Sequence, residues 1–391
     1  MALTNISFTI TEDGLARALP NEDNISALLF SGVASPSAWS GQKIRGFTDI
    51  NSVKADGITS TSVTYSEVYY HVSEFFRVSP GALLYIGFGL TDIAEEVYNV
   101  SGGKVRQYGA FITSLADAQG VHQAIANTMN GKFAPLSIVL GYEPVATPAS
   151  VNDLDDLSLK TAPYVSVVAF GDDNGRGKAL AGALGKPYIA AVGTCLGLVS
   201  KASVQESIGA LNRFNLTDGI EFLKTENGVT KPAIKYVTGQ SYSDGLTLQF
   251  DNKKYIVPRF YAGNGGVFIE KDHTAYSPTK DLSNIRSVRT ISKAVRGVRS
   301  RLLTRLKTNV AVDESGFLDA DFIEYLKSLA TTDLQQMQRD GEISRFGVSI
   351  DPNQNVLSTD RIDIDIRIIP VGVANFINVK IGFTRSLQGF Q

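Results

Sequence analysis

Short, strongly apolar runs alternate with longer amphipathic stretches from about Ile25 to Ile269, and this alternation limits the folds open to the chain. The apolar runs are expected to be strands, at Ser26–Gly32, Ala82–Gly87, Leu136–Gly141, Tyr164–Phe170 and Tyr188–Val192. The stretches between them are expected to be helices, at Thr64–Arg77, Leu115–Met129, Val151–Lys160, Gly177–Leu184 and Val204–Phe214. Strands that are apolar on both faces and separated by helices predict an α/β fold with a largely parallel central sheet and flanking helices.

After Gly219 the pattern changes to short strands separated by turn residues. These strands are expected at Ala233–Val237, Leu246–Phe250 and Tyr255–Arg259, with Asp251–Lys254 as a hairpin turn between the last two.

The last third of the chain has a different order of elements. Two long helical patterns, Asp281–Thr308 and Asp319–Arg339, precede two strands, Glu342–Ile350 and Asn355–Ile369. In the second strand four isoleucines alternate with charged residues: Ile362, Ile364, Ile366 and Ile368 with Arg361, Asp363, Asp365 and Arg367. This pattern predicts a smaller C-terminal α+β domain.

Each end of the chain carries an alternating segment that stands apart from its neighbours. The apolar residues of these segments are Ile6, Phe8 and Ile10 at the N-terminus, and Ile377, Val379, Ile381 and Phe383 at the C-terminus. Such strands can pair within their own subunit, or they can extend the sheet of a neighbouring copy. We therefore expect four parts: an N-terminal arm (1–24), a central α/β domain (25–275), a C-terminal domain (276–371) and a C-terminal arm (372–391).

Composition argues against an enzyme. The 391 residues carry a net charge of −2 and include one cysteine and three histidines, which excludes internal disulfides and multi-cysteine metal sites. Near-neutral charge gives no reason to expect direct binding of nucleic acid. The N-terminus does not resemble a secretory signal, and the most apolar segment, Tyr188–Val199, is too short to span a membrane. We expect a protein made in a cytoplasm-like compartment, without direct membrane insertion.

Three candidate chemical sites can be weighed against simpler interpretations. The loop Gly171–Ala179 lies between a strand and a helix but lacks the spacing and the hydroxyl of a phosphate-binding loop, so a strand–helix turn is favoured. Cys195 lies in an apolar segment and is expected to be a buried, inert thiol. His71 lies on an amphipathic helix and is more often a packed imidazole than a ligand. No catalytic residue, metal or cofactor is predicted.

The strongest local feature is a run of positive charge in the first C-terminal helix. Between Leu282 and Val312 there are eight basic residues and no acidic one. On a helix, Val288, Ile291, Val295, Val298, Leu302 and Leu306 form an apolar stripe, and Arg286, Arg289, Lys293, Arg296 and Lys307 lie opposite. This face is either a solvated helix surface or a docking surface for an acidic partner, with nucleic acid as a third alternative.

Several runs in the central region resemble contractile tail sheath proteins of bacteriophages and related injection particles. They are residues 165–171 (VSVVAFG), 177–182 (GKALAG), 187–197 (PYIAAVGTCLG) and 202–209 (ASVQESIG). The order of helices and strands in the last third also fits this family. Compared with that family, we expect the chain to be short and to lack large outer decoration domains.

The resemblance implies a structural subunit that polymerises around an inner tube and contracts to drive the tube through a target envelope. The implied partners are other copies in stacked rings, with six-fold symmetry expected, together with the inner tube, baseplate and terminator proteins of a virion tail or injection particle. The two alternating segments would be inter-subunit arms, and Arg286, Arg289, Lys293 and Arg296 are the predicted tube contacts. An α/β metabolic enzyme acting on a nucleotide or sugar phosphate remains the alternative.

Overall fold

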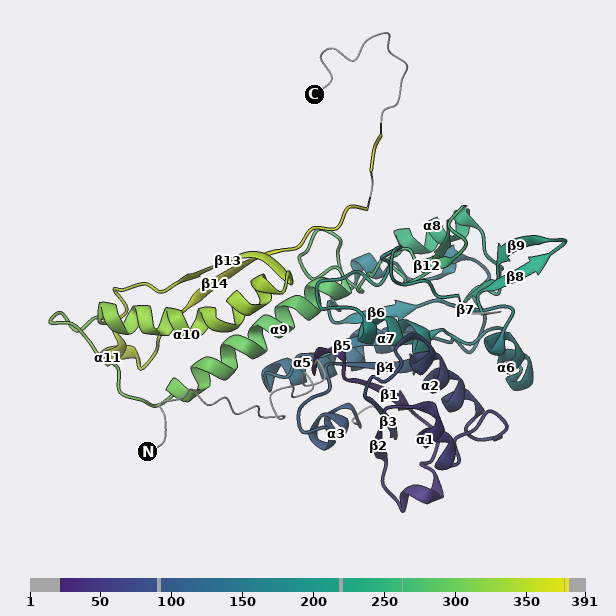
Figure 1. Cartoon of the computed structure of the whole chain (residues 1–391), viewed down its shortest axis with the longest axis horizontal. Coiled ribbons are helices and arrows are strands. Elements are labelled where there is room, and N and C mark those ends of the chain that lie inside the picture. The colour runs from purple at the N-terminus through teal and green to yellow at the C-terminus, as the bar shows by residue number, and fades with distance from the viewer. Residues whose placement is uncertain (1–21, 90–92, 218–220, 262, 376, 380–391) are drawn as a thin grey trace, which may run out of the picture.

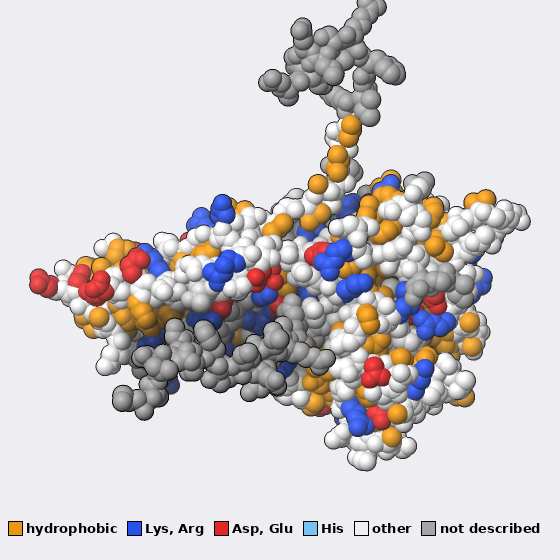
Figure 2. Space-filling view, viewed as in Figure 1, with side chains coloured by type: hydrophobic (Ala, Val, Ile, Leu, Met, Phe, Trp, Pro, Cys, Tyr) orange, Lys and Arg blue, Asp and Glu red, His pale blue; other side chains and the backbone are white. Residues whose placement is uncertain are grey.

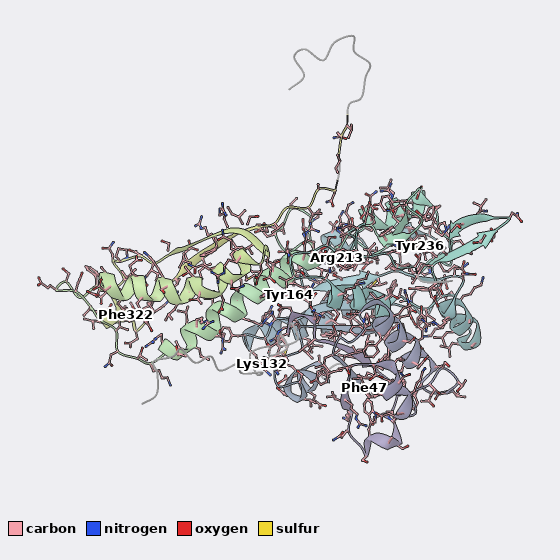
Figure 3. The ribbon with its side chains drawn as sticks, viewed as in Figure 1. Phe47, Lys132, Tyr164, Arg213, Tyr236 and Phe322 are labelled. Carbon is pink, nitrogen blue, oxygen red and sulfur yellow. The ribbon has the colours of Figure 1, made fainter. Side chains whose placement is uncertain are left out.

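The structure is a computed structural model that describes residues 22–89, 93–217, 221–261, 263–375 and 377–379. It is elongated, with an α/β lobe at one end and a lobe built on two long helices at the other (Figure 1). Figure 3 labels Tyr236 in the first lobe and Phe322 near the far end of the second. No helix among the described residues is both long and apolar enough to cross a membrane.

A six-stranded sheet forms the centre of the α/β lobe, in the order β2-β3-β1-β4-β5-β6. Its strands are β1 (Ser26–Phe30), β2 (Ile44–Phe47), β3 (Leu84–Phe88), β4 (Gln107–Ile112), β5 (Ser137–Tyr142) and β6 (Val165–Val168). All neighbouring strands are parallel except β2, which pairs antiparallel with β3 at one edge. The mostly parallel sheet is therefore confirmed. Without β2, the strands have the flavodoxin-like order 2-1-3-4-5.

Helices cover both faces of this sheet (Figure 1). In this lobe they are α1 (Ile50–Ala55), α2 (Ser66–Val78), α3 (Ile93–Val100), α4 (Leu115–Asp117), α5 (Gln123–Gly131), α6 (Arg176–Leu184), α7 (Val192–Lys201) and α8 (Asp244–Asn252). A short π-helix, Ala118–His122, joins α4 to α5. Helix α7 packs against β1, β4 and β5, and α2 packs on α7, whereas α3 contacts β1 and β3. One continuous apolar core results, extending from Ile25 to Ile285.

Glycines allow α7 to lie unusually close to its neighbours. A Cβ at Gly193 would lie 2.1 Å from the carbonyl oxygen of His71 on α2. On the sheet side, a Cβ at Gly141 would come within 2.5 Å of Val192. The predicted strand Tyr188–Val192 is wrong, because residues 188–191 form neither strand nor helix and Val192 begins α7. An uninterrupted apolar run predicts burial, but it does not show where a buried helix starts.

Four other predicted elements differ from the structure. Val151–Lys160 forms two 3-10 turns, Val151–Asp153 and Leu157–Leu159, rather than a helix, and Val204–Phe214 consists of turns. The predicted strand Leu246–Phe250 lies inside α8, which begins because the Ser243 hydroxyl accepts the Leu246 N–H. Asp251–Lys254 is accordingly the end of that helix and not a hairpin turn.

Three two-stranded antiparallel ladders complete this lobe. They pair β7 (Phe170–Asp172) with β10 (Ile234–Tyr236), β8 (Leu223–Glu226) with β9 (Val229–Pro232), and β11 (Pro258–Phe260) with β12 (Val267–Ile269).

The second lobe contains α9 (Ile285–Leu302), α10 (Ala320–Arg339), β13 (Ile343–Ser349), α11 (Val356–Thr359) and β14 (Asp365–Pro370). The strands pair antiparallel, and Ile366 and Ile368 pack toward a small core with Ala294 and Leu334. The alternation predicted for this strand is confirmed, although β14 begins only at Asp365 because α11 occupies part of the predicted range. A second small core surrounds Leu326. Both are separate from the main core.

Candidate functional site

The cationic face of α9 is directed inward, toward a carboxylate that precedes β1. Asp23 lies in a short 3-10 turn, Glu22–Asn24, and is 6% exposed. Lys293 Nζ lies 3.0 Å from Asp23 Oδ2 and 2.6 Å from Glu342 Oε1, and Arg296 pairs with the other oxygen of Asp23. We call Asp23, Arg289, Lys293, Arg296 and Glu342 the Asp23 junction. It joins the first lobe to both α9 and the start of β13.

Arg289 is the most deeply buried cation of the junction, at 5% exposure. Its Nη1 donates to the carbonyl oxygens of Ala202 and Ser203, both at 3.1 Å, and its Nη2 donates to the carbonyl oxygen of Asp23 at 3.2 Å. Burial lowers the pKa of Arg289 to about 10, so the guanidinium is still charged at neutral pH. A buried charge is tolerated only where hydrogen bonds compensate it, and these three carbonyl oxygens do so.

Electrostatics hold Asp23 in its charged form. Burial alone would raise the pKa of Asp23, but Lys293 and then Arg296 bring it below its ordinary value. At the start of α9, Arg286 Nη1 makes a similar contact with Asp272 Oδ1 at 2.5 Å. The positive charge of α9 is thus largely neutralised by carboxylates of the same chain.

This arrangement differs from the exposed cationic face expected from the sequence. Arg289 and Arg296 face the core, and the apolar stripe is only partly covered, with Ile291 37% and Val295 42% exposed. The helix also ends at Leu302 rather than Thr308. The predicted contact of the four cations with an inner tube stays a prediction. The sequence did not indicate Asp23 as their partner because it lies 266 positions before Arg289, and periodicity carries no signal over that distance.

The paired strands β13 and β14 form a sheet of two strands, and neither has a second neighbour among the described residues. After the end of β14, residues 371–375 and 377–379 lead away from the two lobes, with hydrophobic side chains along them (Figures 1 and 2). Ile377 is 81% exposed and Val379 is 71% exposed. Ile6, Phe8, Ile10, Ile381 and Phe383 lie outside the described residues.

The candidate phosphate loop forms the turn between β7 and α6, and its amide groups bind a carboxylate of the chain itself. Asp172 Oδ1 accepts the N–H groups of Phe222 at 2.9 Å and Asn174 at 3.1 Å, and its Oδ2 accepts that of Gly177 at 3.3 Å. Asp172 is 2% exposed, and burial raises its pKa. This carboxylate occupies the position that a phosphate would need.

The two other candidate residues are buried in the first lobe. Cys195 has no exposed surface, and burial raises the pKa of its thiol, as expected for an inert cysteine. His71 also has no exposed surface and packs against the ring of Phe111 with centroids 4.6 Å apart. The imidazole is therefore packed among aromatic side chains in this structure.

Two family models match the chain in succession. The DUF2586 N-terminal domain matches residues 91–273, and the DUF2586 C-terminal domain matches residues 281–388, so the two domains of one family together span most of the chain. The chain belongs to the DUF2586 family. No curated protein shows significant sequence similarity to this DUF2586 protein.

Solved structures similar to the DUF2586 protein include tail sheath proteins. A chain of the anti-feeding prophage baseplate matches with a TM-score of 0.61 at 10% identity, over 98% of this chain and 100% of that one. A chain of the contracted sheath complex of the PVC extracellular contractile injection system matches with a TM-score of 0.61 at 12% identity, over 99% of both chains. A sheath tail protein from Listeria innocua matches with a TM-score of 0.57 at 10% identity, over 92% of this chain and 94% of that one. The DUF2586 protein therefore has the sheath protein fold over nearly its whole length.

Proposed function

We propose that this protein is the structural subunit of a contractile sheath, which polymerises around an inner tube and contracts to drive it through a target envelope. The observation that carries the proposal is the similarity of both lobes, in one continuous match, to proteins whose solved forms include a contracted sheath. An isolated shared lobe would be weaker support, since one fold hosts many functions.

The exposed C-terminal segment and the β13–β14 sheet are complementary parts of a strand-addition contact. A two-stranded sheet with free edges offers unpaired backbone N–H and C=O groups, and an extended segment of alternating apolar residues can bind to them. Ile377 and Val379 are two residues apart, so both side chains would face the same side of the added strand. We infer that residues 372–391 bind the C-terminal lobe of a neighbouring copy, and that residues 1–24 make a second such contact.

Other copies in stacked rings, an inner tube, a baseplate and a terminator are the proposed partners. The similarity to a baseplate chain solved with six-fold symmetry supports a six-fold ring. For the tube contact, Arg286, Arg289, Lys293 and Arg296 remain the proposed residues. Because carboxylates or carbonyl oxygens of the same chain already bind them, the contact would have to compete with those partners. We place the assembled protein in a virion tail or injection particle.

The enzyme alternative has no support from the site geometry. Asp172 fills the only strand–helix loop that the sequence offered for a phosphate, and the similar structures belong to sheath assemblies. We therefore propose a protein without catalytic activity that needs no cofactor for assembly.

The experiment is electron microscopy of purified protein under conditions that favour polymerisation. The full chain should form rings or striated cylinders, whereas the double variant Ile377→Asp/Val379→Asp should stay a folded monomer. The matched control, Asn378→Asp, adds one charge on the opposite side of the strand and should still assemble. Ordered cylinders from the double variant would show that the C-terminal arm is wrongly assigned.

A further inference from the structure

A cavity of about 460 Å³ opens at the carboxyl ends of β1, β4 and β5. Its lining includes Phe30, Ile112, Glu67, Glu143 and Lys186. In sheets with the flavodoxin-like strand order, ligands bind outside the carboxyl ends of the strands, next to the point where the strand order reverses. Here that point lies between β1 and β4. The cavity therefore occupies the place in this fold where a ligand site is expected on topological grounds.

Three potential metal ligands meet beside this cavity: Glu67 and Glu143 line it, and His71 lies buried next to them. Glu67 and His71 lie one turn apart on α2 and so share one face of the helix, and Glu143 directly follows β5. One ligand atom from each lies within 4.8 Å of the other two. Four ligands about 2.0–2.2 Å from a zinc ion would lie roughly 3.5 Å apart, so small side-chain rotations would close the set.

The imidazole of His71 is completely buried, and neither Nδ1 nor Nε2 has a hydrogen-bond partner in the part of the chain that the structure describes. A buried polar group without a partner is costly, and such cases in native proteins call for a ligand or a functional reason.

Lys186 holds the position that a cation would take. Its Nζ lies 2.7 Å from Glu67 Oε1 and 2.7 Å from Glu143 Oε2. The lysine side chain is 34% exposed, so its flexible stem can swing out toward solvent. The second oxygen of Glu143 accepts the Ala190 N–H at 2.9 Å, which fixes the carboxylate in place.

We propose that Glu67, His71 and Glu143 form a binding site for a divalent transition-metal ion, with zinc favoured, and that Lys186 is a displaceable counter-ion occupying the site when the metal is absent. One imidazole and two carboxylates suit zinc, and the cavity supplies room for a water as fourth ligand. A bound ion would join α2 to the end of β5 and stabilise the first lobe. The inference is independent of the proposed sheath function.

The test uses the full chain, stripped of metal with a chelator and titrated with Zn²⁺ by calorimetry and with Co²⁺ by visible absorption. The wild-type protein should bind one equivalent of Zn²⁺ with a rise in melting temperature. Lys186→Met should bind about tenfold more tightly or better, because the competing ammonium is gone. Glu67→Gln, a change at a partly exposed residue, should weaken binding about tenfold or more.

Two further variants separate this site from incidental binding. His71→Leu should abolish the Co²⁺ spectrum, and the matched change His122→Leu, at another buried histidine, should leave it intact. If Lys186→Met does not bind Zn²⁺ more tightly than wild type, Lys186 is only an internal ion-pair partner and the proposal is overturned. Binding that persists unchanged in Glu67→Gln and His71→Leu would equally overturn it.

Discussion

Replacing Asp23 with asparagine should loosen the contact between the two lobes while keeping the shape of the side chain. The change removes the one carboxylate shared by Lys293 and Arg296. Removing one partner of a fully buried ion pair costs about 3–5 kcal/mol, because the other charge is left uncompensated. The cost should be smaller here, since Lys293 keeps Glu342 and the two cationic side chains are 26% and 17% exposed. We expect a loss of about 2–3 kcal/mol in the free energy of unfolding.

The assay is urea unfolding of the monomeric protein at low concentration, with fluorescence and far-UV circular dichroism followed in parallel. The matched control is Asp333→Asn, which breaks the pair with Arg301 at 3.1 Å between side chains that are 29% and 49% exposed. An exposed pair of this kind contributes about 0–1 kcal/mol. If Asp23→Asn costs no more than Asp333→Asn, the Asp23 junction does not hold the lobes together. The cations of α9 would then be free to serve another partner.

Two further predictions concern packing and pH. Gly193→Ala should destabilise the protein by about 3 kcal/mol, since the new Cβ would collide with the carbonyl oxygen of His71. The control Gly182→Ala, with open space around it, should stabilise α6 by about 0.5–1 kcal/mol. Equal melting temperatures of the two variants would contradict the close approach of α2 and α7. Burial lowers the pKa of His122 to about 4, so its neutral form stabilises the fold above about pH 6.5, and this stability is lost as the pH falls toward 4. Between pH 7 and pH 5 the wild type should lose about 2 kcal/mol more than His122→Leu does; identical pH profiles of unfolding free energy would refute it.

Local patterns in the sequence predict the strands of the sheet better than they predict its short buried helix. β1, β3, β5 and β6 are runs of apolar residues between turns, and all four were expected. The strand predicted at Tyr188–Val192 does not form, because an apolar run without polar positions shows burial and does not show that α7 begins at Val192. Leu246–Phe250 failed because the N-cap at Ser243 and tertiary packing outweigh a short strand-like pattern.

In the candidate site too, residues close together in the sequence could be predicted, whereas contacts between distant residues could not. Periodicity identified the cationic residues of α9 and the alternating residues of β14. It carried no information about Asp23, whose distance along the chain from Lys293 is unrelated to their separation of 3.0 Å in space. The grouping of Glu67 with Glu143 also depends on strand order, which a single sequence does not determine.

We infer that the ends of this chain bind neighbouring copies. A cryo-electron-microscopy map of the assembled polymer would show this at the outer edges of β13 and β14, which pair with no other described strand. We expect residues 377–383 of one copy, and residues 6–10 of another, to extend that sheet in a third. A map in which both ends of every copy pair only with their own subunit would contradict it.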